Sequence, residues 1–176
     1  MSLGEYHPQF WRETFSPNII KTRIIPVPKT FIQYIQADGL VLPQRAIVHT
    51  LGRDELPLDE TMREVEAEGP PAPAFLDLND AIETAIRDLG GKVFVKLNGK
   101  APVDAAWING GSMACITAGE VYLLLKASTR VAQHVDMSGQ DDSDAIVIKK
   151  WANLYPSMEF RCFVRNKVLL GTLACI

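Results

Sequence analysis

The sequence predicts an α+β fold in which mainly antiparallel sheets pack against helices. Stretches near residues 29–37 and 77–89 repeat apolar side chains at the spacing of a helix face, and glycines follow both. Between and after them lie runs of β-branched and aromatic residues bounded by turn-forming residues, which is typical of strands. The last of these runs follow one another with short polar connections, and such connections favour antiparallel pairing.

The composition indicates a folded domain without a general affinity for nucleic acid. The chain has 176 residues, of which 47% are hydrophobic and 22% charged, so it can bury a core. Its formal net charge of -3 argues against a general nucleic-acid binder, since such proteins carry basic patches that neutralise phosphates. A discrete anionic ligand stays compatible with this charge.

The cysteines and the amino terminus indicate an intracellular protein of the reducing cytosol or nucleus, and we expect it in the cytoplasm. The three cysteines lack the spacing of zinc or redox motifs, which fits a reducing compartment. The sequence shows neither a signal peptide nor an apolar run of bilayer length. We therefore expect no membrane partner.

The first predicted elements are a strand and a helix. Residues 19–28 are apolar and β-branched enough for a strand, and its two prolines place it at the edge of a sheet. Residues 29–37 then predict a helix, with Gly39 at the position of a left-handed cap. The buried face of this helix is predicted to comprise Phe31, Tyr34 and Ile35.

An acidic, proline-rich segment divides the chain. Residues 54–73 contain seven acidic residues against one arginine, and they end in glycine and prolines. Such a segment buries too little apolar surface to offset its ordering entropy. We predict an amino-terminal strand and helix segment over 1–53, a flexible linker over 54–74, and partial nucleotide-binding lobes over 75–176. The linker is either a solvated insertion or an interaction or phosphorylation segment.

Two further helices and a strand follow. Residues 77–89 predict a helix with Asp77 as its N-cap, ended by a pair of glycines, and a strand follows at once over 93–96. Its apolar stripe is predicted to comprise Ala81, Ile82, Ala85, Ile86 and Leu89. Thr117 and Glu120 match the T-x-x-E capping pattern and predict the start of another helix.

The final third predicts an acidic loop and an antiparallel meander. The loop covers residues 136–144. Residues 145–151, 158–164 and 168–173 read as strands, and 165–167 as a tight turn.

The loop after the 93–96 strand carries candidate ligands for an anion. The Lys96 ammonium could reach phosphates, and Gly99 would let backbone amides approach an anion. The alternative is a solvated lysine at the end of a strand. Asp104 could bind a ribose or hold a lysine, or it could be an ordinary cap or turn carboxylate, and Trp107 is predicted to lie in the core.

The strand over 145–151 places basic side chains on both of its faces. Alternation predicts Ile146, Ile148 and Lys150 on one face and Val147, Lys149 and Trp151 on the other. Adenine is commonly held by the backbone at such a strand end, between apolar side chains. Structural burial of Trp151 is the alternative, and the two are compatible.

On the next predicted strand, Arg161 offers a planar donor fork suited to phosphate, with Glu159 close enough to orient it. A cross-strand ion pair is the alternative. The three histidines lack the spacing of metal ligands, and no hydroxyl, histidine and carboxylate set is evident. We therefore expect neither a catalytic site nor a metal site built from these residues.

The motifs as a group resemble the eukaryotic cell division cycle protein 123 family. The resemblance extends over residues 10–171. It rests on IIKTRIIPVPKTFIQYIQADG, LGGKVFVKLNGKAPVDAAWI and KKWANLYPSMEFRCFVRNKVLLG. The acidic segment falls where family members have a variable acidic insertion.

This resemblance implies an ATP-grasp-like fold that binds ATP between two lobes. It also implies an assembly chaperone that binds the gamma subunit of eukaryotic translation initiation factor 2 and promotes its joining to the other subunits. The implied ATP-binding residues are Lys96 at the phosphates, Ala101 and Asp104 in the nucleotide loop, Lys149, Lys150 and Trp151 at the adenine hinge, and Arg161 on the phosphate side.

The sequence also departs from the family pattern. Val95 and Gly99 replace a proline and a tryptophan, and the pattern breaks after Gly171. We therefore expect an amino-terminal portion, with the magnesium ligands of the family in the carboxyl-terminal part that it lacks. Two alternatives are an ATP-dependent ligase or kinase of the same architecture, and a protein-binding scaffold without a nucleotide.

Overall fold

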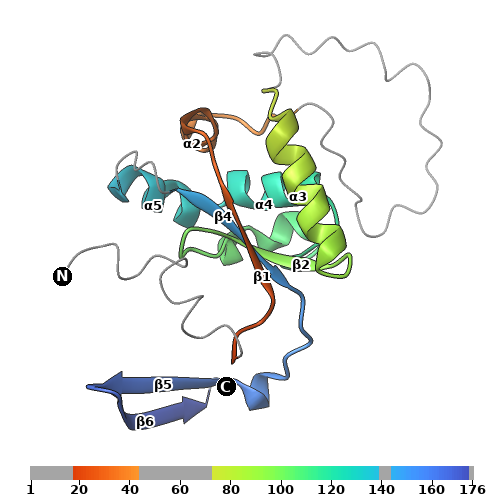
Figure 1. The fold of residues 1–176 in the computed structure, drawn as a ribbon. Coiled ribbons are helices and arrows are strands. Elements are labelled where there is room, and N and C mark those ends of the chain that lie inside the picture. The colour runs from red at the N-terminus through yellow and green to blue at the C-terminus, as the bar shows by residue number, and fades with distance from the viewer. Residues whose placement is uncertain (1–17, 44–72, 139–143, 175–176) are drawn as a thin grey trace.

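A four-stranded antiparallel sheet forms the centre of the molecule. The computed structural model describes residues 18–43, 73–138 and 144–174 (Figure 1). The strands are β1 (Thr22–Pro26), β2 (Val93–Leu97), β3 (Ala114–Cys115) and β4 (Ala145–Lys150), in the order β1-β4-β2-β3. Each neighbouring pair is antiparallel, so the predicted α+β class is confirmed. Strand β1 lies at an edge of this sheet, as its prolines predicted.

The segments before and after the predicted acidic linker belong to the same sheet. Strand β1 pairs with β4 along its whole length, from Thr22 opposite Lys149 to Pro26 opposite Ala145. The linker itself, apart from its last two residues, lies outside the described residues. The amino-terminal segment therefore completes the sheet of the following region.

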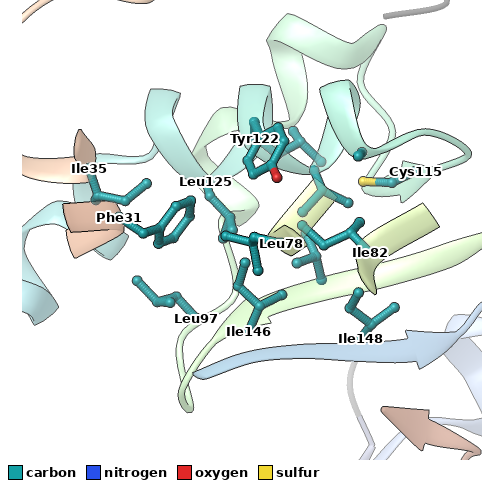
Figure 2. Close-up of a cluster of buried hydrophobic side chains, with 14 of the residues drawn as sticks. Phe31, Ile35, Leu78, Ile82, Leu97, Cys115, Tyr122, Leu125, Ile146 and Ile148 are labelled. Carbon is teal, nitrogen blue, oxygen red and sulfur yellow. The ribbon is translucent and has the colours of Figure 1, made fainter. Parts of the chain in front are cut away.

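Helices cover one face of this sheet. Helices α3 (Leu76–Asp88) and α4 (Ala118–Ala127) pack on its strands, and α2 (Lys29–Gln36) and α5 (Thr129–Ser138) pack beside α4 (Figure 1). Figure 2 shows the resulting core, in which Ile82 and Leu125 from the helices lie between the strands and Tyr122, which is surrounded by helices. The strand residues of the core are Val93, Val95, Leu97, Cys115, Ile146 and Ile148.

The predicted helices exist, but their ends differ in detail. Helix α3 begins at Leu76 with Phe75 as its cap residue, so Asp77 is not the N-cap. It lies in the first turn, where its carboxylate still favours the helix dipole. The C-cap of helix α2 is Ala37, in an extended conformation. Gly39 has the predicted left-handed conformation, with φ +82°, but it lies two residues after the cap.

The acidic loop predicted from residue 136 starts too early, because helix α5 runs to Ser138. Residues 139–143 lie outside the described residues. The capping motif at the start of α4 is confirmed. Thr117 Oγ1 accepts a hydrogen bond from Glu120 N, and the Glu120 carboxylate reaches back to Ile116 N at 2.7 Å.

The prediction that Trp107 lies in the core is wrong. Trp107 is 71% exposed. It belongs to the 3-10 helix η4 (Val103–Asn109), whose buried positions are Ala105 and Asn109. Ala105 and Asn109 face inward, and Trp107 lies midway between them on the outer side.

The last two strands form a separate hairpin rather than part of a meander. Strands β5 (Phe160–Arg165) and β6 (Val168–Ala174) pair only with each other within the described residues, while β4 pairs with β1 and β2. A short 3-10 helix, η5 (Pro156–Met158), precedes them, so the predicted strand begins later than expected. Every residue of the hairpin is exposed, and it lies apart from the main body in Figure 1.

Candidate functional site

The candidate site lies on the face of the sheet opposite the helices. In β2 the buried residues alternate with the half-buried Phe94 and Lys96. Lys96 pairs with Val147 of β4, and Phe94 pairs with Lys149. Paired residues of antiparallel strands point to the same side of a sheet. These four side chains therefore share one face, which we call the second face.

Two lysines are neighbours on the second face. Lys96 and Lys149 are diagonal neighbours on adjacent strands. The Cα atoms of such neighbours in an antiparallel pair typically lie about 7–8 Å apart. Partial burial lowers the pKa of Lys96, and the Lys149 ammonium lowers that pKa further. In residues 18–43, 73–138 and 144–174 the one ion pair is Arg23–Asp88, so no carboxylate of these ranges neutralises either lysine. This arrangement favours a ligand with several negative charges.

The two adjacent lysines at the end of β4 point to opposite faces, as their alternation predicted. Lys150 pairs with Val93, a core residue on the helix side. Its Cε lies 4.0 Å from the position that a Cβ would occupy on Gly90, at the end of α3. The structure therefore brings Lys149, and not Lys150, beside Lys96.

The turn after Lys96 is fixed by an asparagine that the sequence analysis did not single out. Asn98 has a φ of +52°, a conformation that asparagine tolerates better than most residues. Its Nδ2 donates to Asp144 Oδ1 at 2.6 Å, and its Oδ1 accepts from Ala145 N at 2.8 Å. These bonds tie the end of β2 to the start of β4 and so fix the loop next to Lys96. The only local signal in the sequence was the Asn-Gly pair, which is typical of tight turns.

Asp104 serves as a structural carboxylate in this fold. Its two oxygens accept hydrogen bonds from Ser128 Oγ at 2.6 Å and Arg130 N at 3.1 Å, at the start of α5. Partial burial raises the pKa of Asp104, but these hydrogen bonds outweigh it and hold the pKa below its ordinary value. Asp104 therefore acts as a capping carboxylate, which was the second of the two roles predicted for it. Ala101, half-buried between the turn and η4, lies on the same connection.

Trp151 lies where β4 ends, half-buried. Its backbone N–H donates to the carbonyl of Lys92 at 3.0 Å, and its indole Nε1 donates to Asn153 Oδ1 at 3.0 Å. The ammonium of Lys92 lies 5.1 Å from the centre of the indole ring. Lys92 is the second residue that the sequence analysis missed, because its contact with Trp151 joins residues far apart in the chain.

Arg161 lies on strand β5, in the exposed hairpin. It is not part of the second face, and no ion pair with Glu159 occurs in the described structure. The structure therefore places the seven predicted site residues in four locations. Lys96 and Lys149 share the second face. Lys150 and Trp151 lie where β4 ends, with Lys150 on the helix side, whereas Ala101 and Asp104 follow the end of β2, at the opposite end of the strand pair. Arg161 lies on the hairpin.

The described residues contain neither a cluster of metal ligands nor a membrane-spanning helix. Residues 18–43, 73–138 and 144–174 contain no group of three or more histidine, cysteine or acidic side chains placed to hold a metal ion. No helix in these same ranges has the length and apolar character needed to span a bilayer.

Solved structures of one protein resemble this fold closely. The structure of Cdc123 from Schizosaccharomyces pombe superposes with a TM-score of 0.71 at 29% sequence identity, over 96% of this chain and 61% of that one. A carboxyl-terminally truncated form of the same protein gives a TM-score of 0.68 at 31% identity. At these identities the likeness extends beyond a common fold class.

Sequence relatives point to the same group of proteins. Cell division cycle protein 123 from Phaeosphaeria nodorum is 38% identical over 86% of this chain, and the translation initiation factor eIF2 assembly protein from Aspergillus oryzae is 36% identical over 94% of it. The chain spans 44% and 42% of the lengths of these two relatives. The model of the D123 family matches residues 11–174, almost the whole sequence. This chain therefore belongs to the D123 family, the family of cell division cycle protein 123.

Proposed function

We propose that this chain is the ATP-binding part of an assembly chaperone for translation initiation factor eIF2. The observation that carries the ATP proposal is the pair of lysines on the second face, which lack a carboxylate partner among the described residues. A triphosphate offers several negative charges to such a pair. The printed names of relatives as eIF2 assembly proteins support the chaperone role.

In this proposal the fold works in the manner of an ATP-grasp. The phosphates lie over Lys96 and Lys149, the adenine lies against the end of β4 near Trp151, and the hairpin supplies Arg161 from a second lobe. Magnesium bound with ATP would neutralise part of the phosphate charge. The chain then binds the gamma subunit of eIF2 in the cytoplasm and promotes its joining to the other subunits, without turning ATP over.

Thermal unfolding of the full chain with and without MgATP tests nucleotide binding. ATP at about 100 times its Kd should stabilise a protein that binds it only when folded by about 2.7 kcal/mol. We expect this shift to disappear in Lys96→Met and to fall strongly in Lys149→Met. Lys150→Met is the matched control, because it removes a neighbouring charge from the opposite face. An equal loss in Lys149→Met and Lys150→Met would contradict the placement of ATP on the second face.

Binding to purified eIF2 gamma subunit tests the chaperone role separately. We expect a complex with the wild-type chain that weakens in Lys96→Met, and no release of labelled phosphate from ATP. A complex that forms equally well with Lys96→Met would favour a scaffold without a nucleotide. Phosphate release that depends on Lys96 would favour an enzyme instead.

A further inference from the structure

The connection between the sheet and the hairpin begins at Trp151. After this residue, positions 152–155 are exposed, and so are both strands of the hairpin. Within the connection, the described backbone hydrogen bond is local, from Met158 N to Tyr155 O at 2.8 Å. Trp151 is therefore the last residue before the hairpin that is attached to the sheet by the described backbone contacts.

Lys92 contacts Trp151 in two ways. Its carbonyl accepts the Trp151 backbone N–H at 3.0 Å, which extends the pairing of β2 with β4 by one residue. Its ammonium lies 5.1 Å from the centre of the indole ring, within the range of a cation–π contact. Gly90 and Gly91, with φ of +96° and +83°, turn the chain from α3 directly into Lys92. The position of Lys92 is thus set by a tight connection between a core helix and a core strand.

The indole also restrains the residues that follow it. Its Nε1 donates to Asn153 Oδ1 at 3.0 Å, so the ring contacts the second residue of the connection. Lys92 lies on the ring, the ring holds Asn153, and the chain then continues to the hairpin. This series of contacts runs from the rigid sheet to the connection.

We propose that Lys92 is a positioning residue that fixes the direction in which the connection leaves the sheet. In this role Lys92 acts through its contacts with Trp151. Only the expected effect on ATP affinity rests on the proposed function, in which adenine binds at the end of β4 beside Trp151. A cation–π contact at an exposed site changes an equilibrium by about two- to fivefold, so the expected effect on ATP affinity is of this size.

Proton–nitrogen correlation spectra of the full chain test the contact directly. The three tryptophans of the chain give three indole signals, and Trp151→Phe identifies that of Trp151. Lys92→Met keeps the aliphatic stem but removes the charge, so it should shift the Trp151 indole signal and the amides of residues 152–153. Lys92→Arg should retain the wild-type positions, because it keeps a cation over the ring. Arg130→Met, which removes a charge from α5, should leave the Trp151 signal unchanged.

An unchanged Trp151 signal in Lys92→Met, or a failure of Lys92→Arg to restore it, would overturn the inference. ATP titrations of the same variants test the consequence, with an expected two- to fivefold rise of Kd in Lys92→Met and recovery in Lys92→Arg. An unaltered Kd in Lys92→Met, beside a large loss in Lys96→Met, would also overturn the positioning role. If the wild-type chain binds no ATP, the proposed function fails, while the indole signal still decides whether Lys92 orients Trp151.

Discussion

At the scale of single residues, the charged side chains predicted to bind a nucleotide divide into two groups. Asp104 is bonded within the fold, since both of its oxygens accept hydrogen bonds from residues at the start of α5. Partial burial and, after it, the Lys149 ammonium instead lower the pKa of Lys96. The first arrangement stabilises the folded chain, and the second favours binding of an anion.

Replacing Asp104 should weaken the junction between η4 and α5. Asp104→Ala removes the acceptor for Ser128 Oγ and Arg130 N, and loss of such a capping contact costs about 1 kcal/mol. Urea unfolding at pH 7 measures this change in the free energy of unfolding. Because the folded pKa of Asp104 is depressed, its contribution is present above the unfolded pKa of about 3.9 and is lost as the pH falls through the lower folded pKa.

The difference between wild type and Asp104→Ala should therefore shrink as the solution is acidified below about pH 4. A difference that stays constant down to pH 2 would show that the carboxylate charge does not contribute. Asp104→Asn, which keeps an acceptor for Arg130 N, is the matched variant and should lose less stability at pH 7.

Because of the lysine pair, the free energy of unfolding of the ligand-free protein should depend weakly on pH in the alkaline range. The folded pKa of Lys96 lies below its unfolded value, so folding disfavours its protonated form at pH values below the folded pKa. Stability should rise as the pH rises through the folded pKa towards the unfolded value of about 10.4. Lys149→Met should reduce this rise and stabilise the free protein by up to about 0.5 kcal/mol at pH 7, because solvent screens the repulsion.

Urea unfolding between pH 7 and pH 10.5 checks this expectation. Lys150→Met should keep the wild-type profile, since Lys150 lies on the other face. Identical pH profiles of stability for Lys149→Met and Lys150→Met would show that Lys149 is not the neighbour that lowers the pKa of Lys96.

At the scale of helices and strands, the contacts that hold the elements together come from residues with no local signal. The Lys126 ammonium, from the last turn of α4, donates to the carbonyls of Tyr34 and Ala37 and lies 4.9 Å from the centre of the Tyr34 ring. Carbonyl groups at the end of a helix lack partners within the helix and carry partial negative charge. A lysine from α4 thus binds the carbonyl groups at the end of α2, which lie 89 to 92 residues away in sequence.

Lys126→Met should loosen the packing of α2 on α4. The variant loses charged hydrogen bonds at the end of α2, and we expect the free energy of unfolding to fall by about 1–2 kcal/mol. Urea unfolding measures this change, with Lys100→Met as the control because Lys100 is an exposed turn residue. Equal stability of the two variants would show that the contact does not hold α2 in place.

Helix α5 shows why an element can be missed in a sequence. Its buried residues Val131 and Val135 are only one helical turn apart, too few to form a convincing apolar stripe. Its start is fixed by Ser128, whose hydroxyl accepts from Val131 N and donates to Asp104. Half of this cap comes from η4, so the sequence around α5 contains only part of the signal.

At the scale of the whole molecule, the described residues form a packed body and an exposed hairpin. The body buries both the helix side of the sheet and the inner sides of the helices. The hairpin exposes all of its residues, and a two-stranded hairpin alone is marginally stable in water. The two parts should therefore differ in stability.

Hydrogen exchange of the full chain should show this difference. Amides of β5 and β6 should exchange about 100 times or more faster than those of β2 and β4, because the hairpin can open without unfolding the core. Phe163→Ser on the hairpin should change the free energy of unfolding by less than about 0.5 kcal/mol. Ile148→Ala in the core should cost about 2–5 kcal/mol. Equal protection of the hairpin and the central strands would contradict this division.

The sequence by itself determined the features that repeat over short distances. Helices over most of 29–37 and 77–89, the edge position of β1 and the opposite orientation of Lys149 and Lys150 all follow from local periodicity and from proline. The motifs of the sequence were also enough to predict the family to which the chain belongs. Side-chain alternation along a strand is a property of that strand alone, and this is why it could be predicted.

Only the tertiary structure decided which of these residues meet. The register of β2 against β4 places Lys149 beside Lys96, and the packing of η4 against α5 makes Asp104 a cap. The same packing leaves Trp107 exposed, although its size and apolar character predicted burial. Pairing between distant strands and contacts between distant helices depend on how the whole core closes, and no short stretch of sequence contains that information.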